Sequence, residues 1–442
     1  MGVKVVKFGG SSLADADQIR KAAAIIKSDA DRRYVVPSAP GKRSSSDVKI
    51  TDMLYACYEK ASLGENFTED FGRIKTRYNE IIASLGVAIS LDEEFDRIQA
   101  NLASAGREYA ASRGEYLNGI VIAAYLGFTF IDAADVIVFS DEGVMLRHET
   151  VAKLRERLKG VTHAVIPGFY GKSVSGVVRT FSRGGSDVTG SLVARAVHAA
   201  VYENWTDVSG ILAADPRVVK DPVVIPVITY KELRELSYMG FSVLHEDAIF
   251  PVRTAGIPIN IRNTNAPEDV GTMIIPDSDA VDEPVRTITG IAGKKGFVAI
   301  NMEKGMMNSE IGFVRDVLNV FADLGISVEH MPSGIDTLSI IADSASLKGK
   351  EEQLLTALRK AVEPDHLEIE PDIAMLAVVG RGMRKTRGTA ARIFAALAHG
   401  RINVKMIDQG SSELNVIVGV NEHDLHQAIR YIYDVFVLST LN

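Results

Sequence analysis

The stretch Lys4-Val5-Val6-Lys7-Phe8-Gly9-Gly10-Ser11-Ser12 decides the fold of the N-terminal part of the chain. Valine favours a strand, and two successive glycines give the backbone the freedom to turn after Phe8. From Ala14 the apolar residues recur at helical spacing, so the sequence predicts strand, glycine turn and helix. A helix that follows such a turn offers amide groups to an anion, and Lys7 adds a positive charge there. The stretch therefore predicts a phosphate site, with a solvated loop as the alternative.

The composition is that of a globular protein with several domains. The 442 residues are 46% hydrophobic, which suffices for about two to four domains with their own cores. A formal net charge of -8 disfavours a surface for nucleic acid or for an anionic membrane. The single cysteine, Cys57, excludes a disulfide framework and is expected to be a buried thiol. Neither a membrane span nor a signal-like block is apparent, so we expect a cytoplasmic protein.

Strand-like runs alternate with amphipathic segments up to about residue 275, which is typical of an α/β sandwich with a mostly parallel sheet. The predicted helices lie at 93–102, 114–126 and 186–198. The predicted strands lie at 3–7, 34–36, 129–131, 163–166, 202–205 and 259–261. A linker is expected next, because residues 267–284 contain three prolines, several acidic residues and little periodicity.

An internal repeat follows the linker. Residues 312–341 superimpose on residues 388–417 at a constant offset, with apolar residues at the same positions throughout. In each copy a glycine is expected to start a helix, Ile-x-Val to form a strand, and a Ser-Gly or Gly-Ser turn to lead into a second strand. The offset of 76 residues between the copies fits duplicated small α+β domains rather than the shorter repeats of a solenoid.

A second glycine turn lies at Arg183-Gly184-Gly185-Ser186-Asp187, where the predicted helix 186–198 begins. It has the features of an anion-binding helix N-terminus with an added arginine. The alternative is purely structural, with Ser186 as an N-cap and Asp187 as a first-turn acid. Another predicted strand runs into Trp205-Thr206-Asp207, and carboxyl ends of strands often present side chains that bind ligands. An ordinary polar turn is the alternative there.

Three further motifs favour structural interpretations. Ser112-x-x-Glu115 has the spacing of a capping box. Residues 168–173 lack the gap of a Walker phosphate loop, so we expect an ordinary loop. A solvated loop is also expected for the basic residues Arg381, Arg384, Lys385 and Arg387.

Taken in order, these motifs resemble those of the aspartate kinase family over essentially the whole chain. The motifs are 7–12, 114–115, 183–187, 205–210 and 215–217, followed by the duplicated tail. The resemblance implies an amino-acid-kinase α/β/α sandwich with a mostly parallel sheet at residues 1–275 and a linker at 276–290. It also implies two α+β, ferredoxin-like ACT domains at 291–368 and 369–442, interleaved with each other.

The resemblance also implies roles for individual residues. Phosphate and ATP binding fall on Lys7, Gly9, Gly10, Ser11, Thr206, Asp207 and Arg217. Substrate binding falls on Ser38, Thr51, Glu115, Arg183 and Ser186, and catalysis on Lys7 and Asp187. This implication replaces the capping box as the interpretation of Glu115. ATP and Mg²⁺ are the implied cofactors, and no residue is assigned as a metal ligand.

The implied reaction transfers the γ-phosphoryl group of ATP to the β-carboxylate of L-aspartate, giving 4-phospho-L-aspartate, the first step toward lysine, threonine and methionine. A carboxylate with a pKa of about 4 is already ionised at neutral pH, so the acceptor needs positioning and charge neutralisation rather than a general base. We expect Lys7, the Gly9 and Gly10 amides and Mg²⁺ to hold the phosphoryl group.

On the acceptor side, Arg183 is expected to pair with a substrate carboxylate and Glu115 with the substrate ammonium, while Asp187 orients Lys7. Three features depart from the family. The loop 42–49 is longer than usual, Leu212 replaces an aromatic residue, and Ser242 replaces a lysine that would add a charge contact to ATP.

The duplicated tail resembles an amino-acid sensor, so feedback inhibition is expected, with lysine as the first choice of effector and threonine as the second. The matching positions are Met307, Val328, Glu329 and Ser333, and Glu329 could meet an ammonium group. Packing of a dimer interface is the alternative role for these residues. A homodimer or homotetramer is expected through the ACT domains, without nucleic-acid or membrane partners.

Two other functions remain open at this point. Another amino-acid kinase, such as a glutamate kinase, would share the glycine turns but not the duplicated tail. A catalytically silent amino-acid-binding regulator is permitted by Leu212 and Ser242.

Overall fold

The computed structural model describes residues 2–241, 244, 246–277 and 286–437. The chain forms two compact units, the first from residues 1–211, 224–230 and 243–280, the second from 212–223, 231–242 and 281–442. Residues 212–223 and 231–242 of the predicted N-terminal domain thus group with the C-terminal unit. The domain boundaries expected from the sequence remain a prediction. Ser242 and residues 278–285 of the predicted linker lie outside the described residues.

The first unit contains a sheet of eight strands in the order β11-β13-β12-β8-β1-β2-β5-β3, in which only β12 and β13 pair antiparallel. The strands of this sheet are β1 Lys4–Phe8, β2 Arg32–Pro37, β3 Thr129–Phe130, β5 Ala164–Val165, β8 Val201–Thr206, β11 Val227–Thr229, β12 Ile259–Asn263 and β13 Thr272–Ile275. Shorter strands are β4 Val138–Phe139, β6 Tyr170–Ser173, β7 Val178–Thr180, β9 Ile211–Leu212 and β10 Val224–Ile225. Each predicted strand of this region corresponds to a strand of the large sheet.

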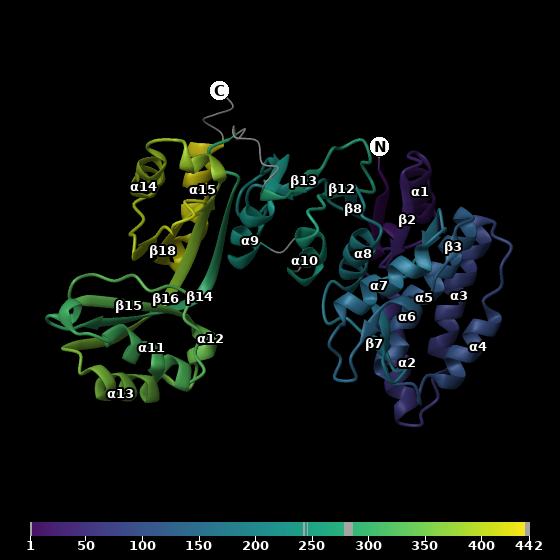
Figure 1. The fold of residues 1–442 in the computed structure, drawn as a ribbon, viewed down its shortest axis with the longest axis horizontal. Helices are drawn as coiled ribbons and strands as arrows, with labels where there is room; N and C mark the ends of the chain where they lie inside the picture. Colours follow the sequence, from purple (N-terminus) through teal and green to yellow (C-terminus); the bar gives the residue numbers. More distant parts are fainter. Residues whose placement is uncertain (1, 242–243, 245, 278–285, 438–442) are drawn as a thin grey trace. The chain divides into compact units, whose positions relative to one another are not determined.

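The helices of the first unit are α1 Ala16–Lys27, α2 Ile50–Ser62, α3 Thr68–Leu85, α4 Asp92–Asn101, α5 Arg107–Leu126, α6 Ala133–Val136, α7 Arg147–Leu158, α8 Gly185–Ala196 and α10 Glu246–Thr254, with a 3-10 turn η1 at Gly10–Leu13. Side chains alternate across β1. Phe8 and its neighbour Val35 lie against α1 and α5, whereas Lys7 points to α8 on the other face. The unit is therefore the α/β/α sandwich that the sequence predicts (Figure 1). In the strand order, β1 lies near the middle of the sheet.

Two predictions for this unit are wrong. Helix α5 begins at Arg107 after Gly106, so Ser112 and Glu115 lie inside it and do not form a capping box. Almost the whole circumference of α5 is buried, which hides the helical period in its first turns. The predicted loop at 168–173 contains strand β6, which pairs with β4 and β7 in a small separate sheet. Cys57 is buried as predicted, and burial raises the pKa of its thiol to about 11.

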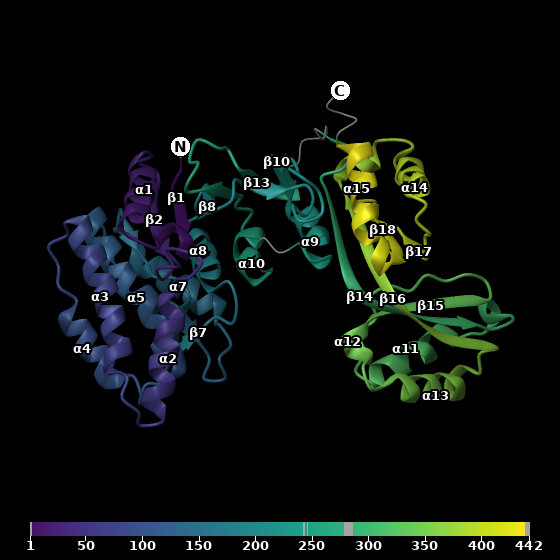
Figure 2. The same ribbon diagram turned by 180° about the vertical axis from the view of Figure 1, so that it is seen from behind.

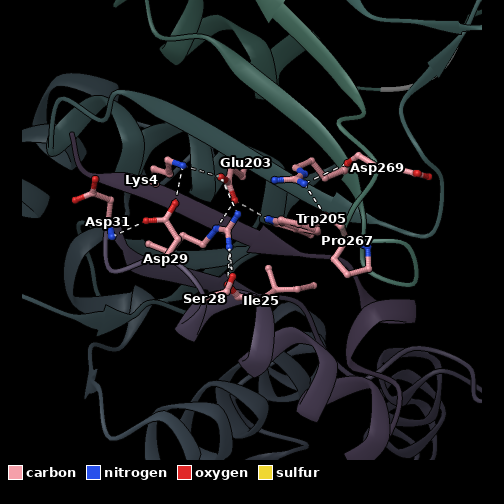
Figure 3. A network of polar contacts seen from close by, with 11 residues as sticks. Lys4, Ile25, Ser28, Asp29, Asp31, Glu203, Trp205, Pro267 and Asp269 are labelled. Atoms are coloured by element: carbon pink, nitrogen blue, oxygen red, sulfur yellow. Dashed lines mark hydrogen bonds and ion pairs between the residues drawn. The ribbon is translucent and has the colours of Figure 1, made fainter. Parts of the chain in front are cut away.

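A buried polar network connects the strands on the face of the sheet opposite Lys7. Arg32 donates from Nε to Glu203 Oε2 (2.8 Å), and both side chains are almost fully enclosed. The indole Nε1 of Trp205 donates to the same oxygen (2.9 Å), and the guanidinium groups of Arg32 and Arg262 lie over its ring. Lys4 Nζ lies 3.5 Å from Glu203 and 2.7 Å from Asp29, which adds a second carboxylate to the network (Figure 3). The network fixes β8 against β1, β2 and β12 from one side.

The second unit contains one antiparallel sheet of five strands in the order β15-β14-β16-β18-β17. The strands are β14 Gly290–Glu303, β15 Thr337–Asp343, β16 His366–Val379, β17 Met406–Asp408 and β18 Asn415–Asn421. The helices are α9 Tyr230–Tyr238, α11 Phe313–Asp323, α12 Ser344–Leu347, α13 Glu351–Val362, α14 Thr389–His399 and α15 Leu425–Phe436, with 3-10 turns η3 Met307–Ser309, η4 Arg381–Arg384 and η5 Glu422–Asp424. The long strands β14 and β16 run through both halves of the sheet, with α11 to α13 beside one half and α14 and α15 beside the other (Figure 2).

The predicted repeat is visible in this unit. Helices α11 and α14 occupy equivalent positions, and each follows a glycine in the left-handed region, Gly312 and Gly388. The strands after the turns are β15 and β18. The Ile-x-Val segments at 326–328 and 402–404 are not strands, because pairing begins only beyond them, at His330 and at β17.

The basic cluster near residue 381 is only partly the solvated loop predicted for it. Arg384, Lys385 and Arg387 are exposed, but Arg381 binds the buried Glu232 of α9 through Nη1 and Oε2 at 2.9 Å. The Arg381 amide and the Thr289 hydroxyl also donate to this carboxylate. Sequence spacing does not show this contact, because the partner lies far away in the chain.

Among the helices of the described ranges, none combines the length and the apolar character that a membrane span requires.

Glu203→Gln should lower the stability of the first unit, because it leaves the Arg32 guanidinium buried without a counter-charge. We expect the free energy of unfolding to fall by about 3 kcal/mol, as measured by urea titration followed through Trp205 fluorescence. Glu69→Gln is the matched control, since it removes an exposed ion pair with Arg73 and should change stability by less than about 0.5 kcal/mol. Equal effects of the two substitutions would contradict the structural role of the buried network.

Candidate active site

Lys7 and Asp187 form a buried ion pair at the end of β1. Lys7 is 8% exposed, and its Nζ lies 2.6 Å from Asp187 Oδ1. Asn204 on β8 connects the two, because its Oδ1 lies 3.3 Å from Lys7 Nζ and its Nδ2 donates to Asp187 Oδ1 at 2.9 Å. Residues from β1, α8 and β8 thus hold one cation at a fixed position beside the first glycine turn.

Strand register explains how these side chains meet. β1 and β8 are parallel neighbours in which Lys7 pairs with Asn204, so both point to the α8 face. The hydroxyl of Tyr202, two residues before Asn204, donates to the Asp187 carbonyl oxygen at 3.3 Å. The first turn of α8 is therefore tied to β8 at both its backbone and its side chain.

In the first glycine turn, one backbone amide predicted to bind phosphate has a partner within the protein. The Gly9 amide donates to the Trp205 carbonyl oxygen at 3.0 Å, so it is not available to a phosphate. The amides of Gly10 and Ser11 stand at the beginning of η1, where an anion could approach them. Ser11 is exposed, whereas Ser12 is buried and hydrogen-bonded to Thr264.

The second glycine turn starts α8. Gly184 is the N-cap with a φ of 55°, so Ser186 is not the cap that the structural interpretation proposed. Ser186 is buried against Gly168, where an added Cβ would lie 2.5 Å from its hydroxyl. Arg183 is exposed and makes no hydrogen bond or ion pair with the described residues. Its guanidinium is therefore available to an anion.

Glu115 is a buried carboxyl group that lacks one partner. It is 6% exposed, and the Ala39 amide donates to it, yet Oε2 has no hydrogen-bond partner among the described residues. Burial raises the pKa of Glu115 from 4.5 to about 8. An unpaired buried oxygen costs free energy unless a ligand supplies a donor, so this position suits a positively charged group.

Ser38 and Thr51 flank the loop that lies beside Glu115. Asn118 on α5 donates to the Ser38 carbonyl oxygen at 2.7 Å, and the Ser38 amide donates to Phe8. Thr51 is partly exposed in the first turn of α2. The structure thus brings Ser38 near both the first glycine turn and the helix that carries Glu115.

The residues predicted for the nucleotide are divided between the two compact units. Thr206 and Asp207 stand at the carboxyl end of β8, next to the first glycine turn, and their side chains are joined by a hydrogen bond of 3.2 Å. Leu212 and Arg217 belong to the second unit, where Arg217 pairs with Asp215 at 2.6 Å. The role of Arg217 stays a prediction.

The predicted effector residues lie in the first repeat of the second unit. Met307 is buried in its core, and Val328 is half-buried against the same core. Glu329 is half-buried, and burial and the neighbouring Asp343 raise the pKa of its carboxyl group. Ser333 is exposed in the turn before β15. An ammonium group beside Glu329 would relieve both unfavourable effects.

The described residues contain no group of three or more histidine, cysteine, aspartate or glutamate side chains that could hold a metal ion. Mg²⁺ in nucleotide sites is commonly bound by one or two carboxylates together with phosphates and water. Asp187 fits that requirement, because Lys7 Nζ and Asn204 Nδ2 contact its Oδ1, which leaves Oδ2 for a further ligand.

Sequence patterns did not reveal Asn204, Gly168 or Phe169. Asn204 becomes visible only once β1 and β8 are paired in register. Gly168 and Phe169 pack on the start of α8, and Phe169 has a φ of 80°. The Pro-Gly pair at 167–168 was the only local signal of this turn.

Comparison with known proteins agrees with this arrangement. The amino acid kinase family model matches residues 2–263, and an ACT domain model matches residues 376–436. Aspartokinase 3 of Bacillus subtilis (strain 168) is 37% identical over 99% of this chain and all of its own length. The crystal structure of Clostridium acetobutylicum aspartate kinase, described as an allosteric enzyme, is 50% identical with a TM-score of 0.87, covering 99% of this chain and 100% of that chain.

E. coli aspartokinase III is a more distant relative at 26% identity. Its structure in complex with aspartate and ADP (R-state) has a TM-score of 0.72, and its structure in complex with lysine and aspartate (T-state) a TM-score of 0.68. Each covers 98% of this chain and 99% of the other. With a family model that matches more than half of its length and relatives that match it from end to end, the chain belongs to the aspartokinases of the amino acid kinase family.

Proposed function

We propose that this protein transfers the γ-phosphoryl group of ATP to the β-carboxylate of L-aspartate, giving 4-phospho-L-aspartate. The observation that carries the proposal is the buried Lys7, held by Asp187 and Asn204 beside a glycine turn. A fixed cation at this point stabilises the charge that moves during phosphoryl transfer. The duplicated tail and the full-length similarity to aspartokinases favour this function over a glutamate kinase or a silent regulator.

The acceptor requires recognition of three charges. Glu115 has the free buried oxygen that an α-ammonium group would satisfy, and Arg183 has an unpaired guanidinium for a carboxylate. The acceptor carboxylate is ionised at neutral pH, so no side chain has to remove a proton. Ser38, Thr51 and Ser186 are the neutral residues proposed to complete the acceptor side.

ATP binding is proposed for the first glycine turn and the end of β8, through Lys7, the Gly10 and Ser11 amides, Thr206 and Asp207. Mg²⁺ bound to the phosphates would neutralise part of their negative charge, and Asp187 Oδ2 is the protein oxygen proposed to contact it. Asp187 Oδ1 meanwhile keeps Lys7 in position.

Lys7→Ala should lower kcat by at least about 100-fold with modest changes in KM, because the cation acts mainly on the transition state. ADP formation that depends on aspartate, with glutamate as the comparison acceptor, is the measurement. Lys4→Ala is the matched control on the same strand, since the ammonium group of Lys4 pairs with Asp29 and Glu203 instead of Asp187, and kcat of this variant should stay within about twofold of the wild type. An unchanged kcat in Lys7→Ala would remove Lys7 from the mechanism, and wild-type protein that ignores aspartate would refute the function.

The pH dependence of kcat/KM for aspartate should report Glu115. Because its pKa is about 8 in the free protein, the carboxylate that binds the ammonium group becomes populated as the pH rises from 6 to 8. We therefore expect kcat/KM to rise about tenfold per pH unit below the pKa and to level off above it. For the Glu115→Gln variant, kcat/KM for aspartate should be low and should change little with pH across this range.

Glu108→Gln on the same helix provides the control for that profile. The Thr180 amide and Arg179 hold the pKa of Glu108 below its usual value despite partial burial, so this group stays ionised throughout the range tested. Its variant should keep the wild-type pH profile. A Glu115→Gln profile that still rises like the wild type would exclude Glu115 as the titrating group.

Regulation by an amino acid is proposed for the second unit, with lysine as the first candidate and threonine as the second. The lysine complex of E. coli aspartokinase III supports lysine, and the half-buried Glu329 offers a carboxylate to an ammonium group. A homodimer or homotetramer formed through the ACT domains is also proposed, because the long strands β14 and β16 build a sheet typical of such domains.

Titration of lysine and threonine, singly and together, into the kinase assay should show inhibition by lysine. Glu329→Gln should raise the inhibitory lysine concentration at least about tenfold while leaving kcat unchanged, since it removes the charge proposed to meet the ammonium group. Glu352→Gln, on the exposed side of α13 in the same repeat, should respond to lysine as the wild type does. No response of the wild type to either amino acid would reject the regulatory proposal.

A further inference from the structure

Arg77 is a buried guanidinium on α3 whose partners are backbone carbonyl groups and Asp47, none of them a side chain proposed to touch a substrate. It is 4% exposed, and its nitrogen atoms reach three backbone carbonyl oxygens. Nη1 donates to Val48 at 2.9 Å, and Nη2 donates to Ala14 at 3.1 Å and to Gly41. Asp47 is its counter-charge at 3.3 Å.

These carbonyl groups belong to two different loops of the site. Ala14 follows η1, the turn that begins at Gly10. Gly41 and Val48 flank residues 42–47, which lie between Ser38 and Thr51 and are mostly exposed. One side chain therefore joins the phosphate turn to both ends of the loop that carries the proposed acceptor residues.

The two loops also touch directly at their backbones. The Gly41 amide donates to the Gly10 carbonyl oxygen at 2.8 Å. A Cβ added to Gly41 would lie 2.5 Å from the Gly10 carbonyl carbon and 2.8 Å from the Ser11 nitrogen, so no side chain fits between the loops. Since Arg77 binds the Gly41 carbonyl group, it holds this contact closed from the α3 side.

Burying the charged Arg77 side chain costs free energy, because removal from water disfavours the charged form and lowers the pKa of its guanidinium. Lysine could not replace it, since an ammonium group is compact whereas the planar guanidinium spreads its donors in a fixed fork. Three carbonyl oxygens from two loops can be met at once only by such a fork.

We propose that Arg77 is a positioning residue for phosphoryl transfer, which sets the distance between the phosphate turn at Gly10 and the acceptor loop 38–51. The proposal rests on the proposed function, because the two loops are there assigned to ATP and to aspartate. Each substrate still meets its own loop when Arg77 is replaced, but the γ-phosphoryl group and the acceptor oxygen are no longer held in line. A misplacement of about 1 Å can lower a rate about 100-fold.

The test compares Arg77→Lys with Arg32→Lys, using the full-length protein and the aspartate-dependent ADP assay. Arg32 is the matched control, because it is equally buried but binds Glu203, Ser28 and the Ile25 carbonyl group instead of the loops. Arg32→Lys keeps a positive charge beside Glu203, so the buried network that fixes β8 is retained. Thermal unfolding of each variant gives the folded fraction, so that kcat is expressed per folded molecule. We expect Arg77→Lys to lower kcat about 100-fold with each KM within about threefold, and Arg32→Lys to keep kcat and KM within about twofold.

A second variant separates geometry from general destabilisation. Arg77→Ala leaves a space of guanidinium shape, so millimolar guanidinium should restore part of its kcat, whereas ammonium should not. The proposal is overturned if Arg77→Lys keeps the wild-type kcat, if both lysine variants lose kcat by the same factor, or if KM rises while kcat is unchanged. Absence of aspartate-dependent ADP formation in the wild type would instead refute the proposed function, so the two failures are distinguishable.

Discussion

The ion pair between Lys7 and Asp187 is the contact on which the proposed active site depends. A buried ammonium group without a counter-charge is strongly unfavourable, so Lys7 requires Asp187 at 2.6 Å. Asp187 reaches that position only because α8 starts at Gly185, directly after a glycine in the left-handed region. Asn204 then fixes both groups from β8. The second glycine turn is therefore part of the first site, since it delivers the carboxylate that holds the lysine.

Strand β8 supports this ion pair because its two faces make different contacts. Asn204 and Tyr202 face α8 and bind Asp187. Glu203 and Trp205 face the other way, into the buried network with Arg32 that fixes the position of β8 in the sheet. A shift of β8 by one residue would exchange the two faces and place a glutamate beside Lys7. The buried charges on one face thus protect the register on which the other face depends.

The sequence predicted the features of this fold that are local or periodic. The predicted strands of the first unit, the two glycine turns and the repeated helices α11 and α14 correspond to elements of the structure, because alternation, glycine pairs and a constant offset are visible in one dimension. The start of α5 was not predictable in this way, since a helix buried on nearly all sides has no polar face to reveal its period.

The site residues that the sequence did not predict were missed for a different reason. Asn204 and Arg77 stand among other polar residues of a strand and a helix, and nothing in the sequence distinguishes them from these neighbours. Their importance appears only when distant segments are brought together, as Arg381 and Glu232 also show. The Gly9 amide was assigned to phosphate for the same reason, because its partner, the Trp205 carbonyl group, lies on another strand.

Glu115 shows how the acceptor side differs physically from the phosphate side. Lys7 has its counter-charge within the protein, so the cation is permanently in place. Glu115 Oε2 has no hydrogen-bond partner among the described residues, and burial away from water raises the pKa of this carboxyl group. A bound ammonium group would supply the charge, lower the pKa and recover free energy that the empty site has lost. Binding energy therefore comes from the ligand that the reaction needs, and a neutral molecule of the same shape would leave the buried carboxyl group unsatisfied.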